Sequence, residues 1–463
     1  MLAGASTFLL AAMCTSAPRA ATMTLQDAVS YALDHSPVVA QKRTALAQAH
    51  SALAKARGNA YPLVNGQLQN VSQKSSNYGG VYQIIGAATQ QVFSQNTAQI
   101  GTQYTLQTGG LSFLQLASAR AAEAQAREDL TGAEDQLATS VTTAYFTVVQ
   151  RQAIVVLDES DLKYQNVLVG VAKAKEQAGM AAGVDVLKAQ VAQAKSAAAL
   201  VGARADVENG IDQLVQSIGA PLDVAFVFPK DIANPALPTE PEPNLETVAV
   251  KSRPDVESAR DSLAAAQFTR KGWGRELYPQ VQLTAGFGNQ LAPTNVTFLT
   301  NPDGTPVLGP GGVPVAAPRT GSPGFWTLGA TSTFTLPFVD YGARQTERES
   351  DDAAVASSQN ALDQATTQVR VDVRTSYRSA QSALSQLTFV RDEARLGTES
   401  ARVAELQYRH GLISLSDVLQ TQQQSISAQS DFVNARVAYV DAVVKLRVSL
   451  GIYDARSAVA DLR

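Results

Sequence analysis

The chain has few of the residues that build metal centres, disulfide frameworks and catalytic sites. Its 463 residues include one cysteine, Cys14, and three histidines, His35, His50 and His410, which form no spaced ligand cluster. The sequence also contains no glycine-rich loop of the kind that holds phosphates and no nucleophile elbow. We therefore expect a protein that is not an enzyme and that binds no cofactor and no metal.

A strong charge of one sign and long apolar runs are missing as well. Acidic and basic residues are mixed along the chain, the net charge is −4, and no long basic run occurs. Nucleic acid is therefore not expected as a partner. Past the N-terminus no stretch approaches the roughly 18 consecutive apolar residues of a membrane helix. If the chain crosses a membrane, it must do so as β-strands.

Residues 1–22 are interpreted as a secretory signal peptide. An apolar stretch from Phe8 to Met13 is followed by small residues and a proline, a pattern more typical of a signal than of a spanning helix. Cys14 offers a second interpretation as a lipid-acceptor cysteine, although Met13 directly before it fits that signal poorly.

The strongest feature of the sequence is an internal repeat. Residues of the first half recur at an offset of 232, as Gly110 does in Gly342 and Gly219 in Gly451 (342 − 110 = 451 − 219 = 232). An earlier block, which begins at Pro37 and Pro254, repeats at an offset of 217 (254 − 37 = 217). The predicted organisation is two copies of one structural unit at 23–225 and 244–453, a proline-rich linker at 226–243 and a C-terminal tail at 454–463.

Within each unit a narrow apolar stripe recurs at helical spacing. Residues from Leu130 to Val148 show it in the first half, stepping by threes and fours. No proline interrupts the chain from Gly110 to Gly179, so a helical arm there would extend roughly 100 Å at about 1.5 Å per residue. Gly179 then offers a turn, and a second arm returns to Gly219. The pattern predicts long helical hairpins with thin, alanine-rich seams.

Strict alternation of apolar and polar residues occupies the stretches between the arms. It covers residues 281–288 and 326–336 in the second half and 98–106 in the first, with a less regular strand at 64–72. A length of about 10 to 12 residues suits tilted strands that cross a membrane. Aromatic residues near the strand ends suit membrane interfaces, although ordinary strand aromatics would look the same. They are Tyr61, Tyr278, Phe325, Trp326 and Phe338.

Four strands per chain cannot close a membrane-spanning sheet by themselves. An open edge in hydrocarbon would leave backbone donors and acceptors unsatisfied, at a cost of several kcal/mol each. Two chains would give about eight strands, a barrel filled by its own side chains, whereas three would give about twelve strands with room for a channel. The polar strand faces would line that channel and the apolar faces would meet lipid.

These features resemble the TolC-like family of outer-membrane efflux proteins. The resemblance covers essentially the whole mature chain, and it rests on the tandem repeat together with four stretches of sequence. These are LQDAVSYALDHSPVV near the start of the first half, LPFVDYG at the entrance to the second long helix, and the paired tips GMAAGVDVL and GLISLSDVL. The first half has YTLQTGG where the second has LPFVDYG.

The resemblance implies a mixed α and β membrane protein in the cell outer membrane that extends into the periplasm. A homotrimer would form a 12-stranded transmembrane β-barrel in contact with outer-membrane lipid, continued by a periplasmic α-helical barrel. The hairpin tips would meet a periplasmic adaptor protein, which links them to an inner-membrane pump. The chain would then be the exit duct of a tripartite efflux or type I secretion system.

An aspartate stands six residues after each tip glycine, Asp185 in the first half and Asp417 in the second. Each carboxylate would lie about 9 Å along the returning helix, near the mouth of the helical barrel, where a ring of carboxylates would attract cations. The pattern from Ser414 to Asp417 also predicts a helix cap, so capping and aperture lining both stay open for this residue. The resemblance adds Tyr408 and Arg409 as residues that hold the aperture closed.

The two tips are also the predicted docking surface for the adaptor. Exposed apolar residues at the end of a solvated helical arm favour docking. The residues concerned are Gly179 and Met180 in the first tip and Gly411, Leu412, Ile413 and Leu415 in the second. The glycines have a second explanation, since a turn with positive φ needs glycine whatever binds there.

Two other classes of protein stay open. A structural periplasmic coiled-coil protein without a channel would share the helical stripes but would lack the amphipathic strands. An enzyme would need a convergent polar site, and the chain offers only scattered tyrosine, arginine and carboxylate residues. The sequence does not distinguish drugs, metals, dyes and proteins as substrates.

Overall fold

A computed structural model describes most of the chain after the predicted signal peptide. The described residues are 23–77, 89–221, 224–229, 234–238, 240–292, 301–303, 305–315, 324–334 and 339–452. The predicted signal peptide, the C-terminal tail, Cys14 and Phe338 lie outside these residues, and the predicted linker lies partly outside them.

The chain divides into two compact units. The helical unit is drawn from Met1–Ala47, Ala124–Asp261 and Gln359–Arg463, and the sheet unit from Gln48–Glu123 and Ser262–Ser358. Each unit therefore takes residues from both halves of the sequence. The repeats seen in the sequence are not themselves the compact units of the fold.

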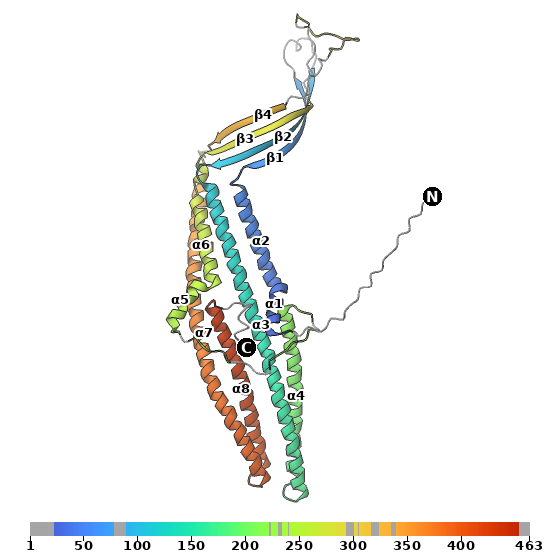
Figure 1. The fold of residues 1–463 in the computed structure, drawn as a ribbon, viewed down its shortest axis with the longest axis vertical. Coiled ribbons are helices and arrows are strands. Elements are labelled where there is room, and N and C mark those ends of the chain that lie inside the picture. Colours follow the sequence, from blue (N-terminus) through green and yellow to red (C-terminus); the bar gives the residue numbers. More distant parts are fainter. Residues whose placement is uncertain are drawn as a thin grey trace, which may run out of the picture. The chain divides into compact units, whose positions relative to one another are not determined.

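The helices recur in the two halves at the offsets of the sequence repeat. The long helices α3 (Leu111–Gln177) and α7 (Ala343–Arg409) have 67 residues each, and both begin and end 232 positions apart (343 − 111 = 409 − 177 = 232). Their returning arms are α4 (Gly183–Ile218) and α8 (Leu415–Ser449). The shorter helices are α1 (Leu25–His35), α2 (Pro37–Gly58), α5 (Glu242–Ser252), α6 (Pro254–Gly272) and the single turn η2 (Arg275–Leu277). The predicted helical hairpins are present (Figure 1).

The strands form one antiparallel sheet in the order β1-β2-β3-β4 (Figure 1). They are β1 (Leu63–Asn77), β2 (Thr89–Gln107), β3 (Gln280–Ala292) and β4 (Gly324–Thr333). β4 ends at Thr333, opposite Gln280, and residues 335 and 336 of the predicted strand lie outside the described residues. Pro279 precedes Gln280 and has no N–H to donate to a strand ladder.

One face of the sheet is apolar and the other is polar, as predicted. The register aligns Ile100, Phe287 and Trp326 across three strands, and their side chains are 67%, 68% and 78% exposed. Gln103 and Thr284 are aligned on the opposite face, since successive residues of a strand point to opposite sides. Among the described residues no helix is long and apolar enough to cross a membrane.

Buried tyrosines tie parts of the predicted linker to the helical unit. The Tyr145 hydroxyl of α3 donates to the Val227 carbonyl at 2.6 Å, and the Tyr439 hydroxyl of α8 donates to the Pro235 carbonyl at 2.5 Å. Both rings are less than 5% exposed. The described parts of this segment are therefore packed against the helices rather than acting as a free spacer.

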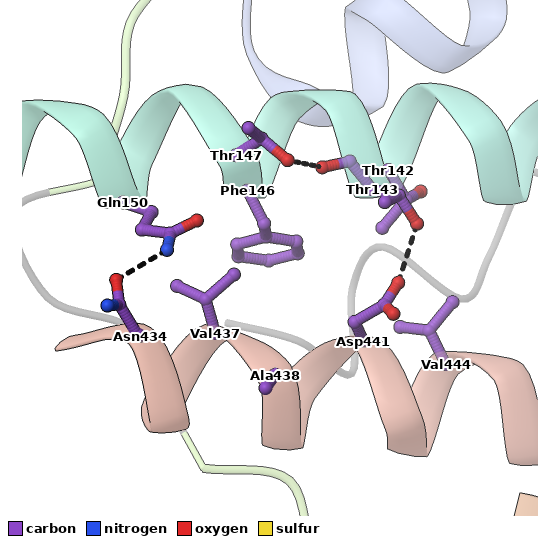
Figure 2. Close-up of a pocket in the computed structure, with 10 residues that line it drawn as sticks. All are labelled: Thr142, Thr143, Phe146, Thr147, Gln150, Asn434, Val437, Ala438, Asp441 and Val444. Atoms are coloured by element: carbon purple, nitrogen blue, oxygen red, sulfur yellow. Dashed lines mark hydrogen bonds between the residues drawn. The ribbon is translucent and has the colours of Figure 1, made fainter. Parts of the chain in front are cut away.

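Polar pairs join α3 of the first hairpin to α8 of the second (Figure 2). The Thr143 hydroxyl donates to Asp441 Oδ1 at 2.7 Å, and Gln150 Nε2 donates to Asn434 Oδ1 at 2.6 Å, beside a cavity of about 180 Å³. The two contacts are seven residues apart on each helix (150 − 143 = 441 − 434 = 7), which is the repeat of a coiled-coil seam. The two hairpins are thus paired in a fixed register.

Candidate functional site

Both hairpin tips close with the same backbone hydrogen bonds. In each, the N–H of the residue after the tip glycine donates to the carbonyl five residues before it, at 2.8 Å. The donor and acceptor pairs are Met180 with Lys175 and Leu412 with Gln407. This pattern is a Schellman cap, which needs positive φ. Gly179 and Gly411 have φ values of 68° and 78°, so the prediction that they form the turns is confirmed.

The two returning helices begin differently. At the second tip Ser414 Oγ accepts from the Asp417 N–H at 3.3 Å, and Asp417 Oδ2 accepts from the Ser414 N–H at 3.1 Å, a complete capping box. At the first tip the N-cap residue is Ala182, which makes no side-chain cap hydrogen bond. Capping therefore accounts for Asp417, as the sequence predicted, but it does not account for Asp185.

An apolar cluster packs the ends of the four long helices together next to the tips. It contains residues from all four long helices: Leu168, Val169, Ala172, Val186, Ala189, Ala404, Tyr408, Leu415 and Val418. Tyr408 is only 4% exposed and lies inside this cluster. The cluster buries apolar surface contributed by both hairpins, so it holds the two tips against each other.

Lys175 makes two contacts with Tyr408 of the other hairpin. Its Nζ donates to the Tyr408 carbonyl, and it also lies 4.0 Å from the centroid of the Tyr408 ring. A cation over an aromatic face is attracted by the ring quadrupole. Lys175 was not predicted as a site residue. A signal for it is present in the sequence, because Lys175 follows Leu168 and Ala172 at helical spacing on the buried seam.

Asp185 has a polar neighbourhood of its own. Lys188 Nζ lies 3.9 Å from Asp185 Oδ1 and donates to Ser416 Oγ on the other hairpin at 3.1 Å. Burial raises the pKa of the Tyr408 phenol, and the Asp185 carboxylate raises it further. Asp185 is therefore electrostatically linked to the second hairpin through Lys188 and Tyr408.

The other two residues predicted to form the aperture, Arg409 and Asp417, have local partners. Arg409 pairs with Glu405, four residues earlier on α7, and Asp417 is held by Ser414. Among the described residues no hydrogen bond or ion pair joins Arg409 or Asp417 to the other two. The structure thus brings Asp185 and Tyr408 together and leaves Arg409 and Asp417 exposed within one chain.

A buried phenol, Tyr164, lies about one helical turn before Leu168 on α3, on the side away from the tips. The Tyr164 hydroxyl is buried and has no hydrogen-bond partner among the described residues. Burial raises the pKa of Tyr164 to about 12, and the Glu405 carboxylate adds to the shift. Close by, Asp161 Oδ1 accepts from Gln165 Nε2 and from Gln422 Nε2 of the other hairpin, both at 3.2 Å.

The predicted docking residues differ in exposure. Met180 and Leu412 are each 73% exposed. The premise that Leu415 is exposed is wrong, since it is 1% exposed, and Ile413 is partly buried against the same cluster. Leu415 is the first residue of α8, and its side chain packs between the two hairpins. The sequence pattern alone does not reveal this contact.

An open groove adjoins the first tip. It has a volume of about 720 Å³ and lies between α3, α4 and α8. Its walls include the exposed Val184, Leu187 and Val191 of α4, with Leu419 and Ile426 of α8 opposite. Val184 and Leu187 were not predicted to line a groove, although with Val191 they recur at helical spacing on one face of α4.

The chain is similar to known efflux proteins over most of its length. A family model described as outer membrane efflux protein matches residues 28–220 and 247–452. The outer membrane efflux protein BepC of Brucella suis is 27% identical over 404 residues, covering 84% of this chain and 81% of the relative. TtgC of Pseudomonas putida, a probable efflux pump outer membrane protein, is 22% identical over 322 residues, covering 68% of this chain and 60% of the relative.

The fold is also that of solved outer-membrane proteins. The outer membrane protein VceC of Vibrio cholerae matches with a TM-score of 0.73 at 18% identity, covering 92% of this chain and 96% of that chain. The chain belongs to the outer membrane efflux protein family. It is accordingly an efflux channel protein of the outer membrane that extends into the periplasm.

Proposed function

We propose that three copies of this chain close into one duct, with four strands from each in a 12-stranded transmembrane barrel. The observation that carries this proposal is the open sheet with one apolar, uncovered face. Among the described residues, β1 and β4 each pair on one side only. Such edges are unsatisfied in hydrocarbon unless another chain pairs with them. The amphipathic strands also argue against a coiled-coil protein without a channel.

Covalent capture of the strand edges tests the trimer. One cysteine at Gln67 in β1 is combined in turn with a cysteine at each β4 position from 325 to 331. Oxidation of membranes should give a covalent trimer in denaturing gels for the positions in register. Pairs of two β1 cysteines serve as the control, since two copies of the same edge do not meet in a ring. Monomers and dimers alone would contradict the proposal.

We infer that residues 23–225 and 244–453 are two copies of one unit, so that a trimer presents six hairpin tips. Support comes from the shared offsets of the long helices and from the two segments that match the family. In the proposed pathway a periplasmic adaptor meets these tips and connects the duct to an inner-membrane pump. The chain is then the exit duct of a tripartite system.

The proposed aperture is lined by Asp185 and Asp417, with Tyr408 and Arg409 holding the tips in place. Its test must separate charge from capping, because Asp417 also caps α8. Asp417→Asn with Asp185→Asn removes two carboxylates per chain, while Ser414→Ala removes the cap and keeps the charge. In planar bilayers the double Asp→Asn variant should have weaker cation selectivity, whereas Ser414→Ala should keep the selectivity of the unchanged protein. If the two variants changed cation selectivity equally, Asp417 would act only as a helix cap.

The proposed docking surface is centred on Met180 and Leu412, which are exposed. Gly179 and Gly411 shape the two turns, and Ile413 and Leu415 anchor the second turn to the cluster behind it. Changing the two exposed residues to glutamate should weaken adaptor binding at least tenfold, because it places charge on desolvated contacts. Val201→Glu is the matched control, an exposed apolar position far along α4. Unchanged binding would move the docking surface away from the tips.

A further inference from the structure

Exposed aromatic residues stand near both ends of the strands. Tyr61 and Tyr278 stand just before β1 and β3 and are 71% and 56% exposed, while Phe287 and Trp326 lie toward the other end. Phe287 stands nine positions after Tyr278 (287 − 278 = 9), about 30 Å of extended chain at about 3.4 Å per residue. At a tilt of about 40° this becomes about 23 Å, close to the apolar band of a membrane barrel.

The helix-side ends of the strands therefore lie at one lipid interface. This step rests on the proposed function, in which the sheet crosses the outer membrane and the helices lie in the periplasm. The interface concerned is then the periplasmic leaflet, which faces the segment from α6 through η2 to β3 and the start of α7.

Three guanidinium groups converge on one indole in this segment. The guanidinium carbons of Arg270, Arg344 and Arg348 lie 5.6, 5.6 and 5.4 Å from the ring centroid of Trp273. The indole is fixed by its own hydrogen bond, from Nε1 to the Arg344 carbonyl at 3.2 Å. The cluster thus gathers like charges around a rigid aromatic platform.

The charge of this cluster is incompletely balanced. Asp352 pairs with Arg270 and lies 3.7 Å from Arg348. Among the described residues Arg344 has no ion pair, and the first turn of α7 contains no acidic residue. The positive end of the helix dipole therefore adds to the arginine charge instead of being offset.

Nearby carboxylates line a separate cavity. Glu276, Glu347 and Asp351 border a cavity of about 410 Å³ between α3, α6 and α7, whose lining includes Trp273 but none of the three arginines. Asp352 holds Arg270 closely, whereas Arg348 lies 3.7 Å from the same carboxylate and Arg344 has no ion pair among the described residues. An anion from outside the chain would therefore meet Arg344 and Arg348 first. Arginine binds phosphate through paired, planar N–H donors, and it does so most strongly at the edge of a low-dielectric medium.

We propose that Arg344 and Arg348, supported by Trp273, bind the phosphate of an anionic phospholipid in the periplasmic leaflet of the outer membrane. A headgroup with net negative charge balances the cluster, whereas a zwitterionic headgroup supplies its own cation and leaves the cluster unbalanced. The exposed Tyr278 lies at the depth of the glycerol and carbonyl region, where amphipathic rings are favoured. The site anchors the duct at a fixed depth and prefers anionic lipid.

The two tryptophans of the chain allow a direct measurement. In a Trp326→Phe variant Trp273 is the sole tryptophan, and its fluorescence is quenched by lipid brominated near the headgroup. Reconstituted nanodiscs contain either brominated phosphatidylglycerol or brominated phosphatidylcholine at equal mole fraction. We expect a quenching-derived association at least fivefold stronger for phosphatidylglycerol. Equal quenching by the two lipids would overturn the proposal.

Charge-matched variants identify the residues responsible. Arg344→Gln with Arg348→Gln should abolish the preference, while Arg395→Gln with Arg402→Gln, further along the same helix, should preserve it. A preference that survives the first pair overturns the assignment to these arginines. A Trp273→Phe variant separately reports Trp326, whose quenching by both lipids tests whether the sheet is in the membrane at all. Quenched Trp326 without any lipid preference at Trp273 refutes only the headgroup site.

Discussion

Exchanging the helix caps of the two tips should reverse their relative stability. The backbone at the two N-cap positions is nearly the same, with φ and ψ of −81° and 150° at Ala182 and −78° and 158° at Ser414. Asp185 already stands three residues after Ala182, where the acidic partner of a capping box belongs. Ala182→Ser should therefore build the missing box, and Ser414→Ala should remove the existing one.

The expected change is about 1 kcal/mol at each tip, within the range measured for N-cap substitutions. At the first tip the gain is partly offset, because Asp185 must share its carboxylate between the new cap and Lys188. That pair is 3.9 Å long and partly exposed, so its loss costs a few tenths of a kcal/mol. A shift of about 1 kcal/mol alters a local opening equilibrium about fivefold.

Amide hydrogen exchange with mass spectrometry reads these openings in the assembled protein. Exchange in residues 183–187 should slow about threefold in Ala182→Ser, because the net gain there is about 0.7 kcal/mol, and exchange in 415–419 should speed up about fivefold in Ser414→Ala. Ala182→Gly is the control, since it changes the N-cap residue without adding a hydroxyl. Unchanged exchange at the first tip in Ala182→Ser would refute the reasoning from backbone geometry.

Three further predictions follow from the described contacts. Lys175→Met should weaken the contact between the hairpins by about 2 kcal/mol, which would appear as faster amide exchange in residues 405–411. Lys173 is exposed on the same helix, so Lys173→Met should leave that exchange unchanged. Leu328→Arg, on the apolar sheet face, should cost about 2–4 kcal/mol and deplete trimers from membranes, whereas Thr327→Arg on the polar face should insert. The folded state keeps the Tyr164 proton, because its pKa is raised from 10.0 to about 12. Stability should therefore be full below pH 10 and fall as the pH rises through 12, and Tyr164→Phe should remove that fall in circular dichroism.

Much of the fold is predictable because local chemistry fixes where the elements end. The absence of proline between Gly110 and Gly179 allows a single helix, and the glycines stop it. The alternation at 281–288 fixes a strand and both of its faces. The extension of β1 to Asn77 was not predicted, because those residues are mostly polar and are held as strand by pairing with β2.

The candidate site was predicted less completely, since it depends on contacts between hairpins. The tip glycines and the Ser414 cap are local and were found from the sequence. The burial of Leu415 and the position of Lys175 over the Tyr408 ring need two helices of different hairpins side by side. A sequence pattern gives the face of one helix but not its neighbour.

The open edges of the sheet bear on how damage spreads among mixed subunits. In the proposed ring, β1 of each chain meets β4 of the next, so every seam takes a different edge from each neighbour. A chain in which one edge strand cannot pair leaves one seam open in any trimer it joins, even when the other two chains are unchanged. Cells making equal amounts of both forms would keep only about one ring in eight intact if subunits mix at random. Edge lesions should therefore behave as dominant alleles, whereas lesions that prevent a chain from joining should be recessive.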